Sequence, residues 1–204
     1  MEIFSLSVKS LLQRRLFSFL LVSLFPVLGL SSSLGQQADA PPSPVVFSVG
    51  SFSFPRPEGW IWVPPTSSIR KAELNIPSSI PGIAPATVTF FCFGRGEGGS
   101  VQANVDRWTA QFSNPDGSPV KAITESRRDN LTDVTLVTAS GLFSSGMDRN
   151  NSTPQARTGL RGAILQSAQG DVYVKMTGPE ALVSSSAQAF EDMIHSACTE
   201  PSPR

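Results

Sequence analysis

The chain has 204 residues, with 16 basic and 16 acidic side chains, so its formal net charge is zero. Charged residues make up 16% of the chain, against about 25% in an average soluble domain. This composition lacks the concentrated positive charge that nucleic acid or an anionic membrane surface attracts, so we expect neither as a partner.

The first 35 residues have the pattern of an export signal. Arg14 and Arg15 precede an apolar run over residues 16–30, and small residues follow it. This order is typical of a cleavable signal peptide. The run is shorter than the roughly 20 residues of a membrane-spanning helix. We therefore predict cleavage after Gly35, no stable membrane anchor afterwards and a periplasmic or secreted location, reached by either the general or the twin-arginine export route.

Removal of residues 1–35 leaves 13 basic and 15 acidic residues, a net charge near −2. Residues 36–44 are rich in glutamine, alanine and proline, which predicts a flexible leader. Residues 45–200 have the length of a single domain.

The first half of this domain is predicted to consist mainly of strands. Apolar residues alternate with polar or small ones over 45–54 and 69–76, and 60–63 is a short apolar segment closed by two prolines. Residues 87–93 are largely apolar at odd and even positions alike, which would face opposite sides of a strand. That pattern predicts a strand buried on both faces, so we expect helices on both sides of the sheet.

The first helix is predicted to begin after Ser100, a residue type that caps helix N-termini well. Apolar residues then recur at helical spacing at Val101, Val105, Trp108 and Phe112. This single stripe predicts an amphipathic helix with one buried face.

The second half is predicted to contain two hairpins and a final helix. The hairpin strands are expected over 120–127 and 131–142, and over 160–166 and 172–177. A long polar loop is expected over 144–157, and the final helix is expected to start at 177–179 with its proline in the first turn. Strands, helix, strands and helix in this order predict an α+β fold, in which a twisted antiparallel sheet is sandwiched between helices.

Two cysteines remain after the predicted cleavage, Cys92 in a strand and Cys198 near the end of the last helix. An even number of cysteines in an exported protein suggests a disulfide. The alternative is two separately buried thiols that act as small apolar side chains.

Residues 94–99 match the pattern GxGxxG between a strand and a helix. Such turns can present backbone N–H groups to a phosphate. However, Glu97 would place negative charge beside that anion, and the sheet is expected to be antiparallel. A tight turn is therefore our main interpretation. Its candidate anion- or partner-binding surface comprises Arg95, Gly96, Gly98, Gly99 and Ser100.

Other chemistry-bearing residues give weaker signals. His195 is the only histidine, and the usual metal sites need several ligands, so we predict no metal site and no cofactor. The charged run 127–129 is interpreted as a solvated turn. Trp60, Trp62 and Trp108 are interpreted as core residues, with a carbohydrate-stacking surface as the alternative if the first two are exposed.

Several segments resemble PsbP-like domains of exported bacterial proteins. They are Pro-Glu-Gly-Trp at 57–60, Ser-Ile-Arg-Lys-Ala-Glu-Leu at 68–74, the stretch 103–112 and Thr-Gly-Pro at 177–179. The resemblance covers roughly residues 50–198. It implies an antiparallel sheet sandwiched by helices, and it implies no shared catalytic site.

These patterns together predict an exported, non-catalytic binding domain that recognises a protein partner of unknown identity. The glycine turn 94–99 and the loop 144–157 are the surfaces expected to take part, because exposed loops often carry function. The alternatives are a hydrolase that uses a pair of carboxylates and a carrier with an apolar pocket for a small ligand.

Overall fold

The computed structural model describes residues 44–65, 67–144 and 155–199. The predicted signal peptide 1–35 lies outside the described residues, as do the leader up to residue 43 and positions 145–154 of the predicted loop.

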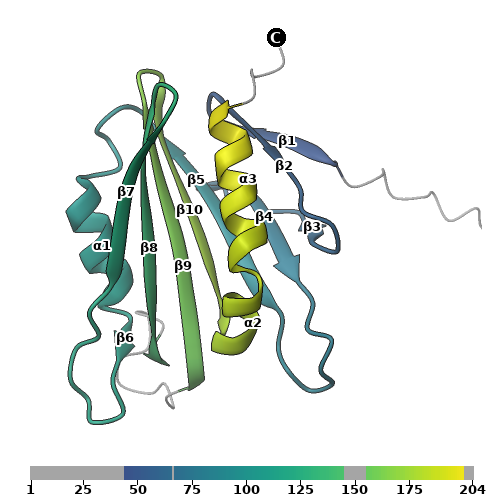
Figure 1. Ribbon diagram of the computed structural model, residues 1–204, viewed down its shortest axis with the longest axis vertical. Helices are drawn as coiled ribbons and strands as arrows, with labels where there is room; N and C mark the ends of the chain where they lie inside the picture. Colours follow the sequence, from purple (N-terminus) through teal and green to yellow (C-terminus); the bar gives the residue numbers. More distant parts are fainter. Residues whose placement is uncertain (1–43, 66, 145–154, 200–204) are drawn as a thin grey trace, which may run out of the picture. The chain divides into compact units, whose positions relative to one another are not determined.

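An antiparallel sheet forms the centre of the domain (Figure 1). Its strands follow the order β3-β4-β5-β10-β9-β8-β6, and β7 also pairs with β8. The strand bounds are β3 Ile61–Val63, β4 Arg70–Ile76, β5 Ala86–Phe93, β6 Phe112–Ser113, β7 Ile123–Asp129, β8 Thr132–Phe143, β9 Gln155–Ser167 and β10 Gly170–Pro179. The predicted α+β class and the antiparallel pairing are confirmed.

The single strand predicted over 45–54 is wrong, because the segment folds into a hairpin of β1 (Val46–Val49) and β2 (Phe52–Pro55). The chain reverses at Gly50, whose φ of 59° favours glycine. A Cβ at that position would lie 2.9 Å from the sulfur of Cys92. The turn therefore packs directly on β5.

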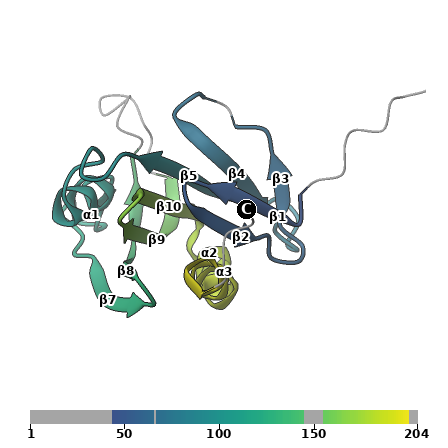
Figure 2. The same ribbon diagram turned by 90° about the horizontal axis from the view of Figure 1, so that it is seen from above.

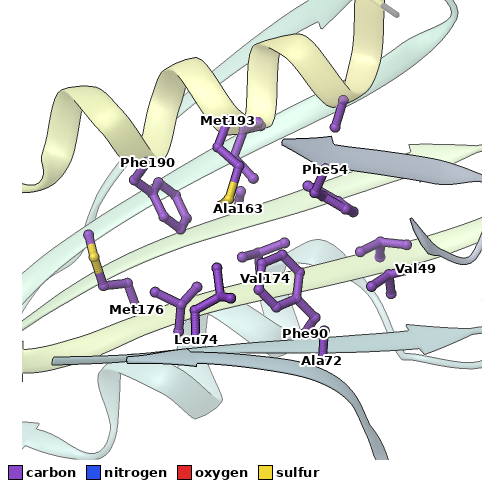
Figure 3. Close-up of a cluster of buried hydrophobic side chains, with 14 of the residues drawn as sticks. Val49, Phe54, Ala72, Leu74, Phe90, Ala163, Val174, Met176, Phe190 and Met193 are labelled. Atoms are coloured by element: carbon purple, nitrogen blue, oxygen red, sulfur yellow. The ribbon is translucent and has the colours of Figure 1, made fainter. Parts of the chain in front are cut away.

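The main core lies between one face of the sheet and a cover made of the β1–β2 hairpin, α2 (Glu180–Ser185) and α3 (Ala187–Thr199). Phe54 and Phe90 meet edge to face, with 5.1 Å between ring centroids. Phe190 and Met193 of α3 are fully buried in the same cluster (Figure 3).

Helix α1 (Val101–Thr109) packs on the opposite face, and Figure 2 shows α1 and α3 on different sides of the sheet. Its predicted cap is confirmed, since Ser100 Oγ accepts a hydrogen bond from the Ala103 N–H at 3.1 Å. Val105 and Trp108 are buried against β8, β9 and β10. The predicted apolar stripe extended the helix too far, because Phe112 already belongs to β6.

The prediction that β5 is buried on both faces is confirmed for one face, whereas the other face is only half-buried. Val88 and Phe90 are fully buried, whereas Thr87 and Thr89 on the other face are only half-buried. On that face, Phe91 and Phe93 are half-buried and pack against the α1 cluster, whose buried residues come from α1, β6, β8, β9 and β10. Polar threonines suit this position because they bond to Asn75 and to the Lys175 carbonyl.

The helix at the end of the chain also starts later than predicted. Pro179 ends β10 and is the N-cap of α2, and Ser186 separates α2 from α3. Strand β9 begins at Gln155, so residues 155–157 are strand rather than loop. Within the described ranges, no helix is both long and apolar enough to cross a membrane.

Candidate functional site

Three turns meet at one end of the sheet and enclose a cleft of about 700 Å³, which we call the turn cleft. These are the turn from β5 into α1, the β7–β8 turn and the β9–β10 turn. The cleft is lined by Arg95, Gly96, Gly99, Ser100, Arg128, Leu131, Asp133, Gln166, Ser167, Ala168 and Asp171. Four residues of the predicted binding surface therefore line one cleft.

Strand pairing brings these distant segments together. Asp133 on β8 lies opposite Gln166 on β9, which lies opposite Asp171 on β10. Asp171 in turn lies opposite Phe93, the last residue of β5 before the glycine turn. The four residues form a row across the sheet, and the turns follow directly from it.

The glycine turn is a close-packed connection. Gly96 and Gly99 have φ of 77° and 84°, where glycine is favoured. Gly98 does not line the cleft, because it rests on Tyr173, and a Cβ at 98 would overlap the phenol. Asn104 of α1 fixes the turn by donating to the carbonyls of Gly98 and Ser100, both at 2.9 Å.

Two backbone N–H groups of this turn are already bonded to carboxylates of the protein. Gly94 N–H donates to Glu97 Oε2 at 3.1 Å, and Gly96 N–H donates to Asp171 Oδ2 at 3.4 Å. A dinucleotide motif uses such groups to bind pyrophosphate. The geometry thus favours the tight turn over a nucleotide site.

The positive charge of the turn cleft comes from Arg95 and Arg128. Arg128 pairs with Asp133 at 2.8 Å, and both side chains are about 60% exposed. Arg95 is exposed and makes no ion pair with any residue that the structure describes. A guanidinium in this setting can bind a carboxylate or phosphate with two parallel hydrogen bonds.

The tip of the β7–β8 turn forms the rim of the cleft. Asn130 has a φ of 54° and donates from Nδ2 to the carbonyl of Cys198 at 3.0 Å, which ties the tip to α3. Leu131 beside it is 84% exposed. The interpretation of 127–129 as a solvated turn between strands is wrong, because these residues end β7 and the chain reverses at 130–131. It also missed the contribution of Arg128 and Leu131 to this cleft.

The carboxylates of the cleft give little support to hydrolysis. Asp133 accepts from Arg128, and Asp171, which is 2% exposed, accepts from the Gly96 amide. Burial and the nearby Asp171 raise the pKa of Tyr173, so its hydroxyl stays protonated and donates to the Gly99 carbonyl at 3.3 Å. Each carboxylate already accepts from a donor of the protein.

The predicted disulfide is wrong for this structure, in which both cysteines are free thiols. Cys92 is half-buried on β5 beneath the Gly50 turn, and Cys198 is on the last turn of α3. Burial and the Asp129 charge raise the pKa of Cys198 to about 11, so it is no thiolate nucleophile near neutral pH. An even cysteine count carries no information about this geometry.

His195 lies beside a charged pair rather than in a metal site. Its Nδ1 is 3.4 Å from Asp129 Oδ2, and Arg127 Nε is 3.0 Å from the same oxygen. Among the described residues, no cluster of three His, Cys, Asp or Glu side chains is arranged to hold a metal.

The tryptophans belong to the core, as predicted. Trp60 and Trp108 are 4% and 6% exposed. Trp62 is half-buried against the main core, with 5.1 Å between its ring centroid and that of Phe47. These positions leave no pair of exposed indoles for a sugar to stack on.

A second, more apolar pocket of about 380 Å³ lies near the opposite ends of the strands. Ile83, Pro85, Phe143 and Pro179 supply most of its apolar side chains. Arg157 lies at this pocket and forms a two-bond ion pair with Glu180. Its Nε donates to Oε2 at 2.5 Å and its Nη2 donates to Oε1 at 3.2 Å. We call it the apolar pocket.

Comparison with protein-family models and with curated proteins gave no match. Among solved structures, the chain is similar to PA94, a protein of unknown function from Pseudomonas aeruginosa, with a TM-score of 0.46 and 11% identity over 78% of this chain and 97% of that one. It is also similar to cyanobacterial PsbP (CyanoP) from Synechocystis sp. PCC 6803, with a TM-score of 0.43 and 10% identity over 73% of this chain and 88% of that one. These likenesses are weak and concern the fold alone.

Proposed function

We propose that this chain is an exported, PsbP-like, non-catalytic domain that binds an acidic group of a partner protein in the turn cleft. The observation that carries the proposal is the position of Arg95. It is exposed at an open polar cleft, and it has no ion-pair partner in the part of the chain that the structure describes. A guanidinium without a partner at a concave surface is suited to bind a carboxylate.

Leu131 adds an apolar contact beside this charge. A side chain that is 84% exposed at the tip of a two-residue turn contributes nothing to the core. An apolar side chain that an interface buries adds to the binding free energy, because its surface is removed from water. The proposed ligand is thus an acidic segment with an adjacent apolar side chain.

Titration of isotope-labelled protein with a peptide of alternating glutamate and leucine tests this proposal. We expect amide shifts at Gly96, Gly99 and Gln166, and their loss in Arg95→Gln. A lysine–leucine peptide is the matched ligand control, and Lys71→Gln, an exposed residue on β4, is the matched protein control. Shifts confined to other surfaces, or equal shifts in Arg95→Gln, would reject the assignment.

The exported location rests on the pattern of residues 1–35 and is part of the same proposal. Mass spectrometry of the protein purified from its cells tests it directly. A mature chain that begins at Gln36 is expected, and an intact amino terminus would contradict cleavage.

The apolar pocket favours a second candidate, a carrier of a small ligand. Its apolar lining and volume of about 380 Å³ fit a compact apolar molecule, and Arg157 lies beside it. Fluorescence titration with an environment-sensitive apolar sulfonate dye would test it. Binding that is lost in Phe143→Ser and retained in Arg95→Gln would support this second function.

A further inference from the structure

The outer edge of the sheet ends in β7, a seven-residue strand that pairs only with β8 in the described structure. Figure 2 shows β7 beyond β8 at the margin of the sheet. All seven residues are exposed or half-exposed, and Ile123 is 66% exposed. Its outward N–H and C=O groups can therefore accept another strand.

The two edges of this sheet differ in how they are protected. The opposite edge, β3, has only three residues, and short edge strands offer little to pair with. Strand β7 contains no proline, and its pairing with β8 shows no register shift. Its charged side chains are therefore the only protection visible within the strand.

Those charges select one partner and one register. We infer that β7 pairs antiparallel with β7 of a second copy of this chain, about a two-fold axis at Ser126. In that register Glu125 of each copy lies opposite Arg127 of the other. Residues directly opposite one another in an antiparallel pair share a face and interact, and opposite charges there are favourable.

The neighbouring registers place like charges together. A two-fold axis perpendicular to the sheet has to place one residue opposite its own copy. The reason is that directly paired residues of an antiparallel pair point to the same face. Centred on Glu125, the pairing would set two carboxylates against each other. Centred on Arg127, it would set two guanidiniums against each other and Glu125 against Asp129. Centred on Arg128, it would set Arg127 against Asp129 but two Arg128 guanidiniums against each other. Only the register at Ser126 pairs opposite charges without a like-charge pair.

The side chains needed for this pairing are accessible. Glu125 is exposed and forms no ion pair with another described residue. Arg127 contacts Asp129 through Nε and is 36% exposed, and a guanidinium has further N–H donors for a second carboxylate. Neither residue lines the turn cleft, so the dimer and the proposed ligand site can be tested separately.

Charge exchange gives a direct test by sedimentation velocity over a dilution series of the protein as its cells process it. The wild type is expected to dimerise. Glu125→Arg and Arg127→Glu should each weaken the dimer by about tenfold or more, because each creates two like-charge pairs. The double variant E125R/R127E should restore it, since the pairs are then reversed rather than removed.

Mixing the two single variants makes the test specific for the register. One copy then carries two arginines and the other two glutamates at these positions, so a heterodimer should form from two poorly associating variants. Glu58→Arg, an exposed charge reversal outside β7, should leave the dimer unchanged. Thermal unfolding of each variant verifies that it is folded. A wild type that stays monomeric, or singles that dimerise like it, would overturn the inference.

Discussion

The indole of Trp108 lies directly on Gly162, so that a Cβ at position 162 would overlap the ring. Gly162 is in the middle of β9, where glycine normally weakens a strand. We predict that Gly162→Ala destabilises the domain by about 1–3 kcal/mol through overpacking. Chemical denaturation measures this change in the free energy of unfolding.

A double variant separates overpacking from other effects of that substitution. Trp108→Leu removes the ring that the new methyl group would meet, so Gly162→Ala should cost less in that background than in the wild type. Equal costs in the two backgrounds would show that Trp108 is not the cause.

The cap of α1 makes a second prediction. Ser100 Oγ is the side-chain acceptor for the Ala103 N–H. Ser100→Ala should therefore lower the unfolding free energy by about 0.5–2 kcal/mol. The control is Ser79→Ala, at an exposed serine outside the helices and strands, which should have a smaller effect. A loss no larger than the control's would mean that the cap contributes little.

Local patterns in the sequence predicted the elements well where one signal dominated. The stripe of Val105 and Trp108 placed α1, alternating residues placed β4, and the hairpin pattern placed β10 within two residues of its observed bounds. They failed at Gly50, because a small residue within an alternating run reads as strand, whereas its left-handed conformation reverses the chain.

The turn cleft was harder to predict because it depends on strand order. Arg95 and the glycines were singled out from their local motif, but Arg128 and Gln166 join them only because β8, β9, β10 and β5 are neighbours in the sheet. Hairpin signals predict the β7–β8 and β9–β10 pairs and are silent on the β8–β9 and β10–β5 contacts. The disulfide prediction failed for the same reason. An even number of cysteines does not show whether the fold brings Cys92 and Cys198 together.

The free thiols make a third prediction. The intact mass of the protein purified without reductant should correspond to two reduced cysteines. At neutral pH, Cys198 should react with iodoacetamide only slowly while the domain is folded, because burial raises its pKa to about 11. Peptide mapping after timed alkylation, compared with the same reaction in denaturant, measures this. A mass two hydrogens lower would contradict the free-thiol structure.

Lys175 makes the last prediction, on how stability depends on pH. Its ammonium group donates to Gln111 Oε1 and lies 5.9 Å from the centre of the Phe143 ring, with no carboxylate within ion-pair distance among the described residues. Burial first, and then the charges of Arg107 and Arg70, lower its pKa from 10.5 to about 8.

The sign of the effect follows from proton linkage. Between pH 8 and 10.5 the unfolded chain keeps the lysine proton that the folded protein has lost, so stability rises with pH. Integration over pH 7 to 9 gives an increase of about 1 kcal/mol. From about pH 8 upward the raised pKa of Cys198 acts in the opposite direction, because the unfolded thiol, with an ordinary pKa of about 8.5, ionises before the folded one.

Urea unfolding in a Cys198→Ala background between pH 7 and 9 therefore isolates the lysine. Stability should increase by about 1 kcal/mol in that background and stay flat after Lys175→Met, because methionine has no proton to lose. Lys121→Met, at an exposed lysine, should keep the full increase. If Lys175→Met retains the rise with pH, another group titrates in this range and the low pKa of Lys175 is not its source.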